Sequence, residues 1–124
     1  TDANLTDANL TLANLTGADL HRRQAKLGGP DLHLSKANLT MARLAGANLT
    51  DANLTDANLT GADLTDADLT DANLTGADLT GASLFGANFA DASLRQANLT
   101  DALADNDTMW PEGFDPVTAG VTCE

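Results

Sequence analysis

The sequence predicts an all-β solenoid, in which short extended segments wind into a coil that stacks on itself. Three features lead to this fold class. Leucine recurs at every fifth position, as in the stretch from Leu49 to Leu79. Alanine stands two positions before the central leucine in all eighteen regular repeats, which run from 3 to 20 and from 37 to 104. The two residues after the leucine are mostly Thr followed by Asp or Gly, which favour turns.

A period of five fits neither regular element on its own. In an α-helix a five-residue step turns each leucine by roughly 140° from the last, so no apolar face forms. In a flat strand an odd step places successive leucines on opposite faces. The chain must therefore change direction within every repeat.

Each repeat divides into a side and a corner. Counting the central leucine as position i, the alanine at i−2 and the leucine share one face of a short extended segment, and the Asn or Asp at i−1 points the other way. Positions i+1 and i+2 form the corner. A repeat this short buries its apolar face only when coils stack. Burying one leucine stabilises by about 1.5–3 kcal/mol, so the sixteen regular leucines supply the core in a chain with three Phe, one Trp and no Tyr.

The tandem A(N/D)LTX repeats resemble the pentapeptide repeat family over residues 1–20 and 35–104. The resemblance implies a right-handed quadrilateral parallel β-helix of about five coils, with residue n beneath residue n+20. The square cross-section comes from the resemblance, because the period alone does not separate three sides from four.

The pattern divides the chain into a β-helix at 1–104 and a short C-terminal capping segment at 105–124. Within the β-helix, residues 21–36 interrupt the repeat and predict an irregular coil. There "AKL" (25–27) fits a side with Leu27 inward, "GGPD" (28–31) is a turn, and Leu32 and Leu34 fit the next inward pair. This interpretation gives two bulged corners, each with two extra residues. A tolerated surface insertion and a protruding basic loop that contacts a partner both remain open.

The C-terminal segment is expected to cover the end of the coil. An open β-helix end exposes unpaired backbone groups and invites end-to-end growth. Trp110 and Phe114 are the predicted apolar cap, over the leucines that end near Leu94 and Leu99. The stretch "WPEGFDP" resembles the C-terminal segment of many cyanobacterial and other bacterial members of the family, which favours a bacterial origin. Cys123 is the single cysteine, so it forms no internal disulfide.

The charge distribution points to a protein partner. The formal net charge is −12, which disfavours direct binding to nucleic acid or to an anionic membrane. Five of the six basic residues form a basic collar within 22–43, and these are Arg22, Arg23, Lys26, Lys36 and Arg43. The collar is the candidate contact for an acidic partner, although the sequence does not identify that partner. No apolar run is long enough for a transmembrane helix.

The sequence holds no catalytic, cofactor-binding or metal-binding motif. His21 and His33 lack ligand partners at the spacing of a zinc site. Asp51, Asp71 and Asp91 are expected to stack as a vertical acidic ladder about 4.8 Å apart, and solvated carboxylates are the expected state rather than a cation site. We expect no enzyme activity and no cofactor.

Three functions are compatible with these features. The first is a rigid protein-binding scaffold. The second is a DNA mimic that binds a type II topoisomerase such as gyrase, as some family members do. A rod of ~24 Å would need about fourteen charges to match B-DNA, near the −12 found, but the basic collar is wrong for a phosphate mimic. The third is ice binding through threonine columns, which Phe85, Ala90 and Arg95 interrupt.

Two expectations concern the surroundings of the chain. The repeat is already in register at Thr1, without an initiator Met. We therefore expect either an upstream capping segment or an end-to-end homodimer through the N-terminal faces. The bacterial cytoplasm is the favoured compartment.

Overall fold

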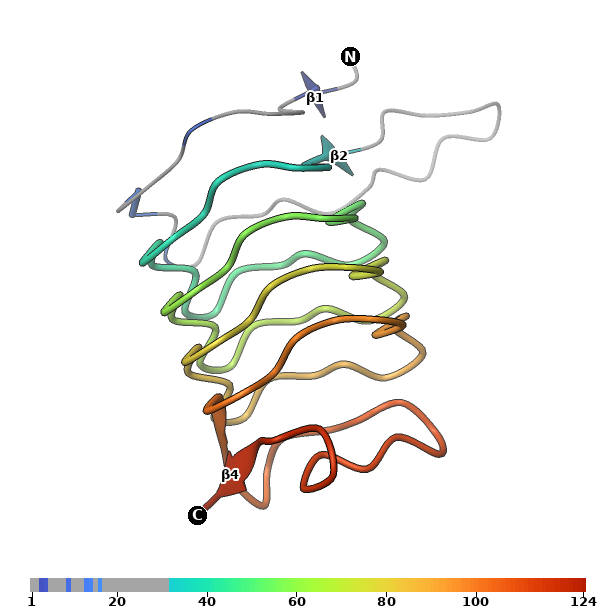
Figure 1. Ribbon diagram of the computed structural model, residues 1–124. Helices are drawn as coiled ribbons and strands as arrows, with labels where there is room; N and C mark the ends of the chain where they lie inside the picture. The colour runs from blue at the N-terminus through green and yellow to red at the C-terminus, as the bar shows by residue number, and fades with distance from the viewer. Residues whose placement is uncertain (1–2, 5–8, 10–12, 15, 17–31) are drawn as a thin grey trace.

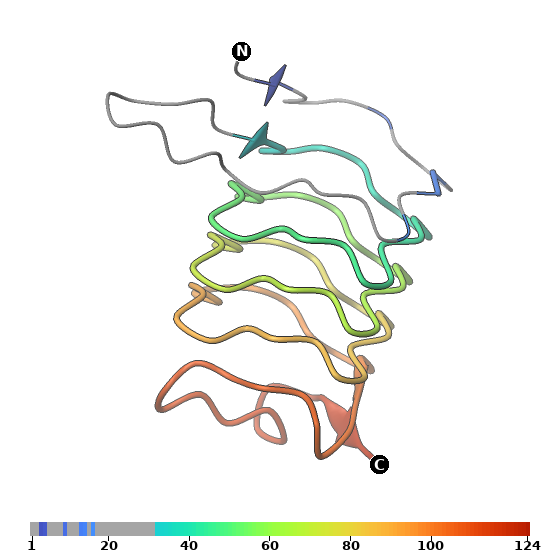
Figure 2. The same cartoon turned by 180° about the vertical axis from the view of Figure 1, so that it is seen from behind.

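The computed structural model describes residues 3–4, 9, 13–14, 16 and 32–124, which wind into stacked coils along one axis (Figures 1 and 2). It has four two-residue strands: β1 (Ala3–Asn4), β2 (Leu32–His33), β3 (Leu103–Ala104) and β4 (Thr122–Cys123). β1 pairs with β2 and β3 with β4, both in parallel. Single parallel bridges join the levels between these two pairs.

The bridges define four sides. From residue 33 to residue 103 each bridge joins residues 20 apart, so four pentapeptides complete one coil as predicted. We name each side by the outward residues at its centre. Side 1 has His33, Asn53, Asn73 and Ser93; side 2 has Asn38, Asn58, Asp78 and Asn98; side 3 has Arg43, Asp63, Ser83 and Leu103; side 4 has Asn48, Asp68, Asn88 and Met109. With Asn4 above His33, side 1 spans five levels.

The predicted register of the first coil is wrong. Ala3 pairs with Leu32, Asn9 with Asn38 and Asn14 with Arg43, each an offset of 29 residues. The prediction of two sides with bulged corners between Leu20 and Leu39 requires an offset of 22 to 24. The coil therefore holds nine residues more than a regular one, and they fall between Asn14 and His33. Leu27 itself lies outside the described residues.

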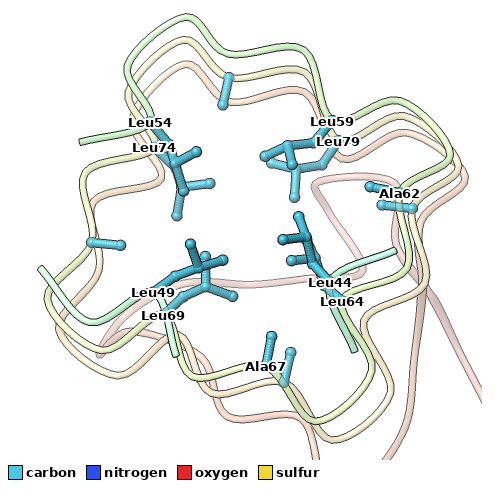
Figure 3. Packing of buried hydrophobic residues seen from close by; sticks show 14 of the residues in the cluster. Leu44, Leu49, Leu54, Leu59, Ala62, Leu64, Ala67, Leu69, Leu74 and Leu79 are labelled. Atoms are coloured by element: carbon cyan, nitrogen blue, oxygen red, sulfur yellow. The ribbon is translucent and has the colours of Figure 1, made fainter. Parts of the chain in front are cut away.

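The core consists of aligned leucines separated by alanines (Figure 3). The predicted column of Leu39, Leu59, Leu79 and Leu99 is confirmed. The bridges between the residues just before them align these leucines on successive levels, and none is more than 1% exposed. Leucines from all four sides point toward the axis, and alanines such as Ala62 and Ala67 line the walls between them. Phe89 replaces a leucine on side 4 and is fully buried. The alternation of large and small residues fills the narrow bore.

The corners explain the Asp and Gly at position i+2. All fourteen residues at position i+2 from Lys36 to Asp101 have positive φ, and five of them are glycines. This left-handed conformation is easiest for Gly and is favoured by Asp over most other residues. The alanine that begins the next side donates its N–H to the carbonyl of the preceding leucine, as Ala72 does to Leu69 at 3.0 Å. A type II turn has this bond and this backbone conformation.

The outward Asn or Asp and the Thr of each repeat form a structural pair. Thr70 donates both its backbone N–H (3.0 Å) and its hydroxyl (2.6 Å) to Oδ1 of Asp68. The same two bonds join Thr50 to Asn48 and Thr75 to Asn73. The side chain at i−1 thus holds the start of the corner, which is the mechanism of an Asx turn. We call this arrangement the Asx–Thr pair.

The C-terminal segment covers the strands of sides 3 and 4 and one corner of side 2. On side 4, Met109 and Trp110 lie beneath Asn88 and Phe89, and the Met109 carbonyl accepts from Phe89 N–H at 2.8 Å. On side 3, β4 lies beneath β3. On side 2, Gly120 lies under the corner, where its carbonyl accepts from Asp101 N–H at 3.0 Å. Residues 105–124 therefore continue the rod by less than a full coil.

Candidate partner-binding surfaces

The described part of the basic collar lies on one coil but on different sides. Lys36 occupies the corner after side 1, and Arg43 is the outward residue of side 3. Both side chains are exposed. Arg22, Arg23 and Lys26 lie outside the described residues. The two described members therefore present positive charge around the N-terminal coil rather than in one row.

The predicted acidic ladder occupies the corner after side 4. Asp51, Asp71 and Asp91 have similar φ values of 63°, 61° and 59°. Asp51 N–H donates to the Thr70 carbonyl at 3.0 Å, one level below, and Asp71 N–H donates to the Ala90 carbonyl at 3.1 Å. Over the described residues, no cluster of three or more His, Cys, Asp and Glu side chains is placed to hold a metal ion. The positive φ that the corner requires accounts for aspartate at these positions.

One outward carboxylate on the sides has a shifted pKa. The Thr80 hydroxyl and then the Thr80 backbone N–H donate to Asp78, and these bonds hold the pKa of Asp78 below its ordinary value. Asn58 and Asn98 occupy the equivalent positions above and below Asp78. Asn and Asp are interchangeable there because each offers an Oδ1 acceptor to the following Thr.

A carboxylate also organises the start of the C-terminal segment. Oδ1 of Asp105 accepts from Gly86 N–H and from Asp107 N–H, each at 3.0 Å, and from the Thr108 hydroxyl at 3.1 Å. At the corners from Lys36 to Gly81 the corner N–H donates to a backbone carbonyl of the coil below, so at Gly86 the Asp105 side chain replaces that carbonyl. Although desolvation raises the pKa of Asp105, the hydrogen bonds outweigh it and the pKa is lowered.

Three aromatic rings form a continuous stack at the same end. Phe89 and Trp110 have ring centroids 5.3 Å apart with nearly parallel planes, and Trp110 and Phe114 are 5.1 Å apart. Phe89 is fully buried, whereas Trp110 and Phe114 are half-buried against the core. The predicted cap residues thus pack against the core, Trp110 through Phe89 on side 4 and Phe114 beside the hollow that Leu94 lines. Their capping role stays a prediction.

Side 1 ends in an open hollow. Its volume is about 270 Å³, and it is lined by Ala92, Leu94, Arg95, Pro111, Glu112, Gly113 and Phe114. Leu94 is 9% exposed, more than any other core leucine.

In the part of the chain that the structure describes, no helix is long and apolar enough to cross a membrane.

These features define a class of protein: a four-sided solenoid built from five-residue turns. Residues 1–22, 31–66 and 62–101 match the family of pentapeptide repeats, in eight copies. The chain belongs to this family. The predicted fold class, an all-β pentapeptide-repeat β-helix, is confirmed. No curated protein matches the chain.

Solved structures of the same family support the assignment. A pentapeptide repeat protein from Nostoc Pcc 7120 is 38% identical, with a TM-score of 0.52 over 100% of this chain and 83% of that one. One from the Arabidopsis thaliana thylakoid lumen is 33% identical, with a TM-score of 0.63 over 73% of this chain and 57% of that one. QnrB1, a plasmid-mediated fluoroquinolone resistance protein, is similar at 14% identity and a TM-score of 0.51 over 99% of this chain and 78% of that one. That likeness concerns the fold alone.

Two features were not predicted from the sequence. The Asx–Thr pair has a signal in the repeats themselves. From position 38 to position 100 every Thr at i+1 follows an Asn or Asp at i−1, and Asn88 with Ala90 is the one Asn or Asp without its Thr. The open end of side 1 has no such signal, because it depends on where residues 105–124 cross the coil.

Proposed function

We propose that the chain is a non-catalytic, rigid scaffold that binds another protein through its outer surface. The carrying observation is the Asx–Thr pair, which fixes outward side chains in rows on the rod. A surface whose side chains are already held loses less conformational freedom on binding. Pentapeptide repeat proteins of this kind have varied roles, so the partner has to be argued from the surface.

The basic collar is the surface we assign to an acidic partner. Residues 44–124 contain fourteen acidic residues and one basic residue, Arg95. The collar therefore stands apart from an otherwise acidic rod, and complementary charge would orient a partner at that end. Lys36 and Arg43 are exposed and available for such contacts. The bacterial cytoplasm stays the predicted compartment.

Affinity capture with matched charge variants tests this proposal. The bait is the full chain, compared with a Lys36→Glu, Arg43→Glu double variant and with Arg95→Glu as the control at the other end. A partner retained by the parent and by Arg95→Glu, but lost from the double variant and at raised salt, supports the collar. Equal capture by all three baits assigns binding to another surface.

The alternative is a DNA mimic that binds a type II topoisomerase such as gyrase. The side aspartates Asp63, Asp68 and Asp78 are accounted for as acceptors in their own corners. The corner aspartates are accounted for by positive φ. Since structure explains the charge, we rank mimicry second. Inhibition of gyrase supercoiling by stoichiometric amounts of the chain would reverse this ranking.

A further inference from the structure

The last strands of sides 1 and 2 both end without a strand beneath them in the described rod, but they differ in how far their leucines are covered. Within residues 32–124, neither Leu99 N–H nor the Ala97 carbonyl on side 2 has a backbone partner, yet Leu99 is only 1% exposed, whereas Leu94 on side 1 is 9% exposed. At the levels above, Leu54 N–H donates to the Asn73 carbonyl at 2.8 Å, and Leu74 N–H donates to the Ser93 carbonyl at 2.8 Å. In return the Ala72 carbonyl accepts from Ser93 N–H at 2.9 Å. Sides 3 and 4 are covered at this end by β4 and Met109, and side 2 is covered only at its corner, by Gly120.

The last strand of side 1, residues 92–96, has the same backbone groups as the strands above it but no strand beneath it. Within residues 32–124, no hydrogen bond involves the N–H of Leu94, the N–H of Gln96 or the carbonyl of Ala92. The equivalent N–H groups one level up, those of Leu74 and Gly76, donate to the Ser93 and Arg95 carbonyls at 2.8 and 2.9 Å. Three groups of residues 92–96 are thus aligned for one more parallel strand.

We propose that residues 92–96 form a docking strand that binds an extended segment of another protein by adding it as a parallel strand. The first residue of the segment would donate to the Ala92 carbonyl and accept from Leu94 N–H. The carbonyl two residues later would accept from Gln96 N–H. Main-chain bonds supply affinity in this mode of recognition, and side-chain pockets supply specificity.

The hollow selects the second residue of the segment. In each coil above, the residue after the bridged one is an inward leucine, such as Leu74 after Asn73. The same position in an added strand faces the hollow beside Leu94 and Phe114. A leucine-sized aliphatic side chain there covers apolar surface that the tail leaves open.

Arg95 selects the third residue of the segment. It is the single cation among residues 44–124, it is exposed, and it lines the hollow. The added residue lies beneath it, as Arg95 lies beneath Thr75. An Asp or Glu at that position places opposite charges side by side across adjacent strands. The preferred segment therefore has a polar residue, then an aliphatic residue, then an acidic residue.

The end also discriminates between a strand and a whole coil. A second copy stacked head to tail would need all four sides free, and residues 105–124 occupy sides 3 and 4. The opening accepts one extended segment. This inference goes beyond the proposed function, which concerns the basic collar at the other end of the rod, and each can fail without the other.

The test uses the full chain, ¹⁵N-labelled, and the capped peptide Thr-Asp-Ala-Asn-Leu-Asp-Gly. We expect the amide resonances of Leu94 and Gln96 to shift on titration, while those of Leu54 and Leu74 do not. Methylating the peptide nitrogen of its Asn removes one main-chain bond and leaves every side chain in place. That change should weaken binding by about tenfold or more.

Charge reversal tests the third position. A peptide with Lys in place of the last Asp should bind the parent more weakly and the Arg95→Glu variant more tightly. Met41→Glu, at an exposed position far from residues 92–96 and outside the collar, is the control and should leave both affinities unchanged. Equal binding of the methylated peptide, absence of shifts at millimolar peptide, or shifts spread evenly over the rod would each overturn the proposal. The same shifts on concentrating the chain alone would also overturn it, because the occupant would then be a second copy.

Discussion

The regular coils and the C-terminal end are made from the same repeat but use its outer positions differently. In residues 37–80, eight of nine repeats have Asn or Asp at i−1 with Thr at i+1, the sequence pattern of the Asx–Thr pair, and Arg43 with Ala45 is the exception. In residues 81–105, one of five does, at Asn98 and Thr100. The inward alanines persist through both regions. The inner positions therefore define the fold, while the outer pair can be given up where the chain must turn, end or bind.

The largest expected effect comes from removing residues 105–124. This truncation uncovers Phe89 and opens the edges of sides 3 and 4 and the corner of side 2, which creates a template for association. We expect the truncated chain to form larger species by light scattering and to melt well below the parent. If it stays monomeric and melts like the parent, Trp110 and Phe114 are not a cap.

A core substitution measures how rigid the two regions are. Ala72 is 1% exposed at the wall of a regular coil, so Ala72→Leu should overpack the bore and cost about 1–3 kcal/mol. Ala97, half-buried in the last coil, has space nearby, and Ala97→Leu should cost at most about 1 kcal/mol. Thr70→Ser keeps the corner hydroxyl and should stay within about 0.5 kcal/mol. Urea unfolding of the three variants gives the order of their stability losses. Equal losses for Ala72→Leu and Thr70→Ser would contradict the assignment of Ala72 to the core and Thr70 to the surface.

Restoring an Asx–Thr pair tests whether the pair stabilises the rod. Ala90 N–H already donates to Oδ1 of Asn88 at 2.9 Å, but alanine has no hydroxyl. Ala90→Thr supplies the second bond and should stabilise by about 0.5–1 kcal/mol. Ala90→Val adds similar bulk without the hydroxyl and serves as the control. A gain from Val as large as that from Thr would assign the effect to packing.

The smallest effect is an acid transition in the C-terminal segment. The Thr118 hydroxyl and the N–H groups of Thr118 and Val117 hold the pKa of Asp115 below its ordinary value, and the pKa of Asp105 is also lowered. A lowered folded pKa stabilises the segment above the unfolded value of about 3.9. That stability is lost as the pH falls from there through the folded value.

Trp110 reports on this transition because it is the single tryptophan and lies in the segment. Its fluorescence should change at a higher pH than the circular dichroism of the rod. Asp115→Asn, which removes one shifted carboxyl, should make the fluorescence change smaller. Coincident transitions in both signals would show that segment and rod unfold together.

The sequence by itself determined the fold class and the core. Leucine at i and alanine at i−2 exclude the regular elements and require a coil, and the Asp or Gly at i+2 marks a corner that needs positive φ. These inferences succeed because each rests on the local conformation of one repeat, which eighteen repeats restate. The coupling of Asn or Asp with Thr was also present in the sequence.

Only the tertiary structure decided the register of the first coil and the state of the last one. The 29-residue offset between Ala3 and Leu32 depends on which residues face each other across levels, and spacing along the chain does not fix that pairing. Likewise, the bonds from Gly86 N–H to Asp105 Oδ1 and from Asp101 N–H to the Gly120 carbonyl place residues 105–124 across the end of the rod and leave Leu94 open. Such contacts join residues about twenty apart, so they form only once the coils below and above exist.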